Sequence, residues 1–162
     1  LKYYEKLIYN FKSCDICPHE CGIDRTLSLD GICGMGIELE ISSYGPHFGD
    51  KPELVGYSGS GTIFFTGCNL LCVFCQNYKI DYQREGYQIT GEKLSEIMLS
   101  LQEKGCCNIN FVTPTHFKFK ILNTIEIARS SGLNIPIVWN SSGYIKPKTI
   151  KGVKGIVFIF LI

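Results

Sequence analysis

The sequence has 162 residues, of which 45% are hydrophobic and 19% are charged, and its formal net charge is +1. This length allows one domain with a hydrophobic core and a small additional segment. The near-neutral charge excludes the strongly basic surface typical of partners of nucleic acid or anionic membranes, so neither is expected. Because no run reaches the roughly 18 apolar residues of a spanning helix and no signal peptide is visible, a cytoplasmic protein is predicted.

Cysteine is the most informative residue type, since seven of the nine cysteines fall into two clusters. Ligand-like spacing favours metal binding in a reducing compartment over disulfides. The first cluster follows a short helix or arm expected over residues 1–13, and it has the spacing C-x2-C-x3-C-x11-C. Its members are Cys14, Cys17, Cys21 and Cys33.

Four thiolates complete the coordination of a zinc ion, and they equally complete that of an iron–sulfur cluster. His19 is a candidate replacement for one of them. Reduced, buried cysteines are the simpler alternative, but so short and glycine-rich a segment has little core of its own. We therefore predict a metal site here, with zinc or an iron–sulfur cluster as its occupant.

Residues 37–61 form a transition between two kinds of sequence. Ile37–Ile41 alternates with period two and predicts a short strand. His47 stands alone in a loop-like stretch, where packing is a commoner role than metal ligation. A boundary near residue 58 is predicted, with a Cys-rich metal-binding segment over residues 1–58 and an α/β region over residues 59–162.

The second cluster has the spacing C-x3-C-x2-C and consists of Cys68, Cys72 and Cys75. The apolar run Thr62–Phe65 just before it predicts a buried strand, so the cysteines are expected at a strand's carboxyl end, where α/β folds place their chemistry. Three thiolates can hold three irons of a [4Fe–4S] cluster, which normally takes four ligands, and the fourth iron then stays open to a substrate. Buried cysteines and a zinc site are the alternatives, although zinc sites more often pair two C-x2-C units or combine cysteine with histidine.

Beyond residue 62 the pattern alternates strands and helices. A helix is predicted from the N-cap Thr90 to Gly105, and a second helix ends at Gly132. Strands are predicted over 108–112, 135–139 and 155–162. Such βα alternation predicts a parallel sheet or part of a (β/α) barrel. The last eight residues contain no polar side chain, and a parallel strand without a covering helix would expose both an edge and an apolar face, so the chain is expected to be truncated at its C-terminus.

Several phrases of the chain resemble the radical S-adenosylmethionine (SAM) superfamily, and within it the group described as pyruvate formate-lyase activating enzyme-like. The triad matches the superfamily motif C-x3-C-x-aromatic-C, with Phe74 as the aromatic residue. The other matching phrases are Cys14-x2-Cys17-Pro-x2-Cys21-Gly, Gly59-Ser-Gly-Thr-Ile-Phe-Phe65, Gln76-Asn77-Tyr78, Asn108-Ile-Asn-Phe-Val-Thr-Pro-Thr-His116 and Pro136-Ile-Val-Trp-Asn-Ser-Ser-Gly-Tyr144.

The resemblance implies a partial (β/α) barrel of the radical SAM type, in which Cys68, Cys72 and Cys75 hold a [4Fe–4S] cluster whose open iron binds the amino and carboxylate groups of SAM. It implies that Phe74 lies near the adenine. Where the superfamily has a glycine-rich turn that meets the SAM amino group, this chain has a different turn, with Thr113, Thr115 and His116 as candidate contacts; packing or helix capping is the alternative for His116. At the end of the third strand, the resemblance implies SAM contacts by Asn140, Ser141 and Ser142.

The activity implied is reductive cleavage of SAM to methionine and a 5′-deoxyadenosyl radical, with an electron donor such as flavodoxin or ferredoxin. The radical would abstract hydrogen from a substrate, and an activating enzyme would act on a glycine of a partner protein. The alternative is a truncated, catalytically incompetent iron–sulfur or zinc-binding module. A pure electron-transfer protein is a third hypothesis, which the βα pattern and the three-cysteine site disfavour.

Overall fold

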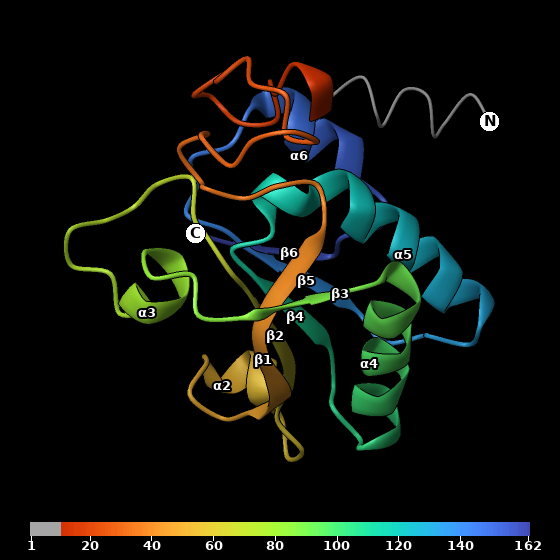
Figure 1. Cartoon of the computed structure of the whole chain (residues 1–162). Coiled ribbons are helices and arrows are strands. Elements are labelled where there is room, and N and C mark those ends of the chain that lie inside the picture. Colours follow the sequence, from red (N-terminus) through yellow and green to blue (C-terminus); the bar gives the residue numbers. More distant parts are fainter. Residues whose placement is uncertain (1–10) are drawn as a thin grey trace.

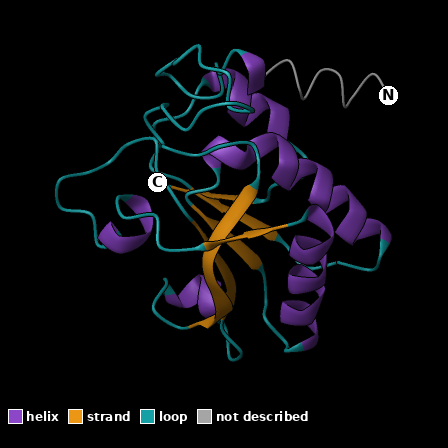
Figure 2. Ribbon diagram, viewed as in Figure 1, coloured by secondary structure: helices purple, strands orange, loops and turns teal. Residues whose placement is uncertain are grey.

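The computed structural model describes residues 11–162 and shows a mixed sheet with helices packed beside it (Figures 1 and 2). Six strands have the spatial order β3-β1-β2-β4-β5-β6. The strands are β1 (Leu39–His47), β2 (Ser60–Phe65), β3 (Tyr87–Ile89), β4 (Ile109–Val112), β5 (Ile137–Asn140) and β6 (Ile159–Leu161). The helices are α2 (Pro52–Val55), α3 (Tyr78–Asp81), α4 (Gly91–Glu103), α5 (Lys118–Ser130) and α6 (Pro147–Val153), with a 3-10 turn η1 at Thr115–Phe117.

The parallel part of the sheet follows the predicted βα alternation. β2, β4, β5 and β6 are parallel neighbours, and α4 and α5 connect β2 to β4 and β4 to β5. The predicted α/β fold is therefore confirmed. The sheet is mixed, however, because β1 pairs antiparallel with both β2 and β3. β1 precedes the predicted boundary near residue 58, so both predicted segments contribute strands to one sheet.

The hydrophobic core lies between the sheet and the two long helices (Figure 1). Alternate residues of β2, β4 and β5 point into it, and Ile63, Phe111 and Trp139 are fully buried in one register row. Thr90 caps α4 as predicted, since its hydroxyl accepts the backbone N–H of Lys93 at 3.1 Å. That helix packs its predicted apolar stripe, Leu94, Ile97, Met98 and Leu101, against the sheet.

The opposite face of the sheet carries a different set of side chains. Thr62, Asn110 and Val138 form one buried register row there, and Phe64, Val112 and Asn140 form the next. Thr62 and Asn110 are polar although they are buried, whereas the three residues of the second row are half-buried. Two buried polar side chains next to a partly open surface direct attention to this side of the sheet.

The last predicted strand is shorter than expected. β6 covers Ile159–Leu161 rather than residues 155–162, because Gly155 takes a positive φ of 89° in the turn that follows α6. The arm or helix predicted over residues 1–13 lies largely outside the described residues. None of the helices in residues 11–162 combines the length and apolar character needed to cross a membrane.

Candidate functional site: two cysteine clusters beside the sheet

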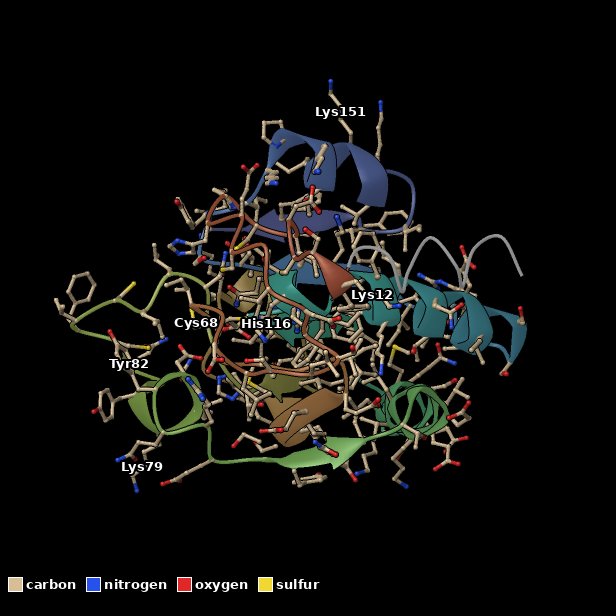
Figure 3. The ribbon with its side chains drawn as sticks, turned by 45° about the horizontal axis from the view of Figure 1, so that its top comes forward. Lys12, Cys68, Lys79, Tyr82, His116 and Lys151 are labelled. Carbon is tan, nitrogen blue, oxygen red and sulfur yellow. The ribbon has the colours of Figure 1, made fainter. Side chains whose placement is uncertain are left out.

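The second cysteine cluster occupies the segment that follows β2, which we call the triad loop (residues 66–77). Cys68 is buried, Cys72 and Cys75 are half-buried, and all three are free thiols. The loop starts at the carboxyl end of a parallel strand, as predicted, beside the ends of β4 and β5. Figure 3 shows Cys68 on this segment, with Tyr82 farther out, and the Tyr82 hydroxyl donates to the Leu71 carbonyl oxygen.

Two of the three thiols, those of Cys68 and Cys75, lie in surroundings that favour the protonated form. Burial raises the pKa of the Cys68 thiol, and it raises that of Cys75 to about 11, with Asp81 adding to the shift. The Cys75 thiol donates to Asp81 Oδ2 at 3.0 Å. Asp81 is itself buried, and its Oδ1 has no partner among the described residues. Because thiolates are the metal-binding form, a metal must displace these protons when it binds.

The donor chemistry of the triad fits an iron–sulfur cluster, since three unpaired thiols share one short loop. Within residues 11–162, no group of three or more His, Cys, Asp or Glu side chains is gathered in metal-binding geometry. Cluster binding therefore requires the thiols to close around the metal. Val73 and Phe74, which lie between Cys72 and Cys75, are 93% and 86% exposed, so this part of the loop is not held by core packing.

The first cluster lies in a loop-rich region that we call the quartet segment (residues 14–36). Cys14 and Cys17 are buried, while Cys21 and Cys33 are half-buried, and all are free. Burial raises the pKa of Cys17, and the neighbouring thiols of Cys14 and Cys21 add to this shift. The quartet is thus brought together by the fold, although its thiols are not gathered to ligand geometry either.

A buried arginine fastens the quartet segment to the sheet region. The Arg25 guanidinium donates to the carbonyl oxygens of Met35 at 2.9 Å and His116 at 2.7 Å. It also lies 5.2 Å from the centroid of the Phe11 ring. Backbone carbonyl oxygens stabilise this cation as hydrogen-bond acceptors, so the contact depends on the course of the chain around Met35.

The quartet segment and the triad loop touch directly. A Cβ added at Gly67 would lie 2.4 Å from Met35 Cγ and 2.6 Å from the Cys33 carbonyl oxygen. Gly67 also has a positive φ of 71°, which glycine adopts without strain. The two cysteine clusters are therefore neighbours, a relation that spacing along the sequence does not reveal.

Asn69 joins three parts of the candidate site. Its carbonyl oxygen accepts the His19 Nε2 proton at 2.7 Å, and its Nδ2 donates to the Tyr144 carbonyl oxygen at 2.6 Å. The Ser142 hydroxyl lies 3.5 Å from Asn69 Oδ1. Of the predicted SAM contacts, Ser142 is thus beside the triad loop, while the buried Ser141 accepts the Gly143 N–H at 3.2 Å. His19 uses its Nε2 atom for the bond to Asn69, and its role as a metal ligand stays a prediction.

The predicted contacts after β4 occupy two different environments. Thr113 is half-buried and has a positive φ of 56°. Thr115 and His116 are enclosed, and His116 Nε2 donates to the Thr66 carbonyl oxygen at 2.8 Å (Figure 3). Burial and, to a lesser extent, the nearby Arg25 lower the pKa of His116 to about 3, so the ring is neutral. His116 holds the start of the triad loop; its predicted SAM contact stays a prediction.

A hollow of about 310 Å³ opens beside the triad loop, on the sheet face opposite α4 and α5. Its lining includes the predicted residue Asn140 and, unpredicted, Asp50, Thr62, Gln76 and Asn77. His47 is at its rim and packs edge-on against Phe64, with ring centroids 5.8 Å apart. One sequence signal could have pointed to this second face of the sheet. In the strand Asn108–Val112, alternation places the side chains of Ile109 and Phe111 on one face and that of the polar Asn110 on the other.

The fold and site define a mixed α/β protein with two adjoining clusters of free cysteines, and comparisons with known proteins add two relatives. The chain is 33% identical to the uncharacterized protein MJ0674 of Methanocaldococcus jannaschii over 160 residues, covering 93% of this chain and 45% of the relative. It is 24% identical to the uncharacterized protein MJ0808 of the same organism over 170 residues, covering 92% and 48%. The chain thus spans about half the length of the curated relatives it matches. No family model and no solved structure matches the chain.

Proposed function

We propose that this chain belongs to a radical SAM iron–sulfur enzyme of the pyruvate formate-lyase activating enzyme-like kind, and that its sheet is part of a (β/α) barrel. The observation that carries the proposal is the C-x3-C-x2-C triad of free thiols on the loop after the first parallel strand. Neighbouring parallel strands end beside this loop, and a partly open polar hollow adjoins it. The resemblance in the cysteine motif and in the phrases after β4 and β5 supports the same proposal.

Cys68, Cys72 and Cys75 would hold the cluster, and the open iron would take SAM. When bound, this pair of cofactors supplies reductive cleavage of the SAM carbon–sulfur bond, driven by an electron from a donor such as flavodoxin or ferredoxin.

The chain's own residues have positioning roles in this proposal. His116 and Gly67 fix the start of the triad loop, and Asp81 orients the Cys75 side chain by a hydrogen bond. Asn69 ties the loop to the segment after β5, where Ser142 is available to a polar ligand. Phe74 is exposed and free to cover the adenine. Residues of the hollow, among them Asn140, would face the reacting end of SAM.

The quartet segment would bind zinc or a second iron–sulfur cluster with a mainly structural role. Its contacts through Arg25, Met35 and Asn69 all support the triad loop or the sheet beneath it. A metal there would rigidify a segment that is poor in secondary structure, because metal binding and folding are coupled in such segments.

A metal-binding module without turnover is the alternative. The observation that favours it is the incomplete cover of the sheet at its edge strand β6, all three residues of which are half-buried. A radical reaction requires a site from which water is excluded. In this alternative the chain would bind iron or zinc but would not cleave SAM.

The test is anaerobic reconstitution with iron and sulfide, followed by dithionite and SAM, with 5′-deoxyadenosine as the product measured. We expect 5′-deoxyadenosine from the chain and none after Cys72→Ala. Cys107→Ala is the matched control, because Cys107 is a free, exposed cysteine outside both clusters. Absence of the product from a chain that holds its full iron complement would reject the enzyme and favour the metal-binding module.

A further inference from the structure

Arg25 is a buried cation without a matching anion among the described residues. It is only 2% exposed, and arginine is rarely so deeply buried unless an anion lies beside it. The ion pairs formed among residues 11–162 do not include it. Its guanidinium donates instead to the carbonyl oxygens of Met35, Gly36 and His116. Carbonyl oxygens satisfy the N–H donors but have no net charge, so the positive charge stays unbalanced in an enclosed position.

This cation lies beside the cysteines of the quartet segment. One of its acceptors, Met35, follows Cys33 by two residues. Burial raises the pKa of the Cys33 thiol, whereas the positive charge of Arg25 lowers it, and the neighbouring thiols of Cys14 and Cys17 add to the rise. The guanidinium is therefore near enough to the quartet to stabilise negative charge on its sulfur atoms.

The acidic side chains of the quartet segment have other partners. Asp15 and Glu20 both pair with Lys146, whose Nζ lies 3.6 Å from Asp15 Oδ2 and 2.7 Å from Glu20 Oε1. Asp24 and Asp30 accept the hydroxyl groups of neighbouring turn residues at the surface. None of these four carboxylates therefore balances the buried guanidinium, and its charge is available to the thiolates.

We infer that Arg25 is the counter-ion of the metal centre formed by the quartet. Four thiolates outweigh the positive charge of a zinc ion or of an iron–sulfur core, so either occupant gives an anionic centre. Enclosing such a centre costs free energy unless a cation lies near it, and the same holds for the enclosed guanidinium. Each charge therefore removes the penalty of the other. This inference rests on the proposed metal site of the quartet, and it assigns the residue that balances the charge of that site.

The test is zinc affinity, measured by competition with a chromophoric chelator on the whole chain with Cys72 and Cys75 changed to alanine, so that the triad does not compete. Arg25→Gln removes the charge and should weaken zinc binding about ten- to a hundredfold, the usual effect of losing a residue that supports metal ligands. Arg25→Lys keeps the charge, and its ammonium has three donors for the carbonyl acceptors, so the loss should be only about threefold. Arg129→Gln is the matched control, because Arg129 also donates to a carbonyl oxygen, that of Leu133, but lies in the last turn of α5, away from the quartet segment (Figure 1).

A second readout separates the charge of Arg25 from its hydrogen bonds. A nearby cation lowers the nucleophilicity of a thiolate, so iodoacetamide should alkylate the zinc-saturated Arg25→Gln variant several-fold faster than the zinc-saturated parent chain. The cobalt-substituted form of the same variant should keep the absorption bands of a four-thiolate site. A purely structural role would change those bands or leave the alkylation rate unaltered.

Undiminished zinc affinity in Arg25→Gln would overturn the inference, as would equal losses in the glutamine and lysine variants. If Arg25→Gln does not fold, a loss of more than about tenfold in Arg25→Lys overturns it alone, because that variant keeps the charge. The assay contains neither iron nor SAM, so it is independent of the chemistry proposed for the triad. A chain that binds no more zinc than its Cys14→Ala variant would reject the quartet metal site together with this inference, whereas zinc binding that is insensitive to charge at Arg25 would reject this inference alone.

Discussion

Replacing Gly67 by alanine tests the contact between the two cysteine clusters. The new methyl carbon would lie 2.4 Å from Met35 Cγ and 2.6 Å from the Cys33 carbonyl oxygen, so either the quartet segment or the triad loop must move. Alanine at a left-handed φ costs about 1–2 kcal/mol, and overpacking adds about 1–3 kcal/mol. We therefore expect Gly67→Ala to lower the free energy of unfolding by about 2–5 kcal/mol.

Gly22→Ala separates the two contributions. Gly22 has nearly the same φ, 67°, but an added Cβ would only touch the Glu20 carbonyl oxygen, at 4.0 Å. Its cost should be the backbone strain alone, about 1–2 kcal/mol. Urea unfolding of both variants, followed by far-ultraviolet circular dichroism, gives the comparison. If Gly67→Ala destabilised the chain no more than Gly22→Ala, the packing of the quartet segment on the triad loop described here would be wrong.

Two further predictions concern single side chains. Burial lowers the pKa of His116 from 6.5 to about 3, so the unfolded chain binds this proton more readily; its contribution to stability is complete above pH 6.5 and is lost as the pH falls toward 3. The loss amounts to as much as about 5 kcal/mol of the free energy of unfolding. His116→Gln should therefore flatten the dependence of this free energy on pH between 3 and 6.5, measured by urea unfolding. An unchanged dependence in the variant would show that His116 is not enclosed. Thr90→Ala should lower the free energy of unfolding by about 1 kcal/mol through loss of the cap on α4. Ser130→Ala, at an exposed position of α5 that caps no helix, should change it little, and equal thermal midpoints for the two variants would contradict the cap.

Much of the architecture could be predicted from local sequence patterns. The apolar runs around Ile63, Phe111 and Trp139 are core strands, and Thr90 starts the helix it was expected to start. Periodicity and capping are local signals, so they place such elements well. The pairing of β1 with β2 and β3 was missed, because antiparallel partners along a strand of mixed polarity leave no comparable pattern.

The candidate site was predictable in its cysteines and not in its surroundings. Spacing identifies the triad and the quartet as ligand sets, but their mutual contact through Gly67 and Met35 depends on tertiary packing. Asp50 was not a candidate, since a single acidic residue in a loop has no distinctive pattern and gains its position only through Asn110. His116 was a candidate contact of SAM, which stays a prediction, and its hydrogen bond to the Thr66 carbonyl oxygen could not be foreseen from the sequence.

We propose that the triad, and not the quartet, holds a SAM-binding [4Fe–4S] cluster. The most direct measurement is electron paramagnetic resonance of the dithionite-reduced, anaerobically reconstituted chain, recorded with and without SAM. We expect a cluster signal that shifts on addition of SAM, that disappears in a variant with Cys68, Cys72 and Cys75 changed to alanine, and that persists when Cys14 and Cys17 are changed instead. A SAM-responsive signal that survives loss of the triad would contradict it.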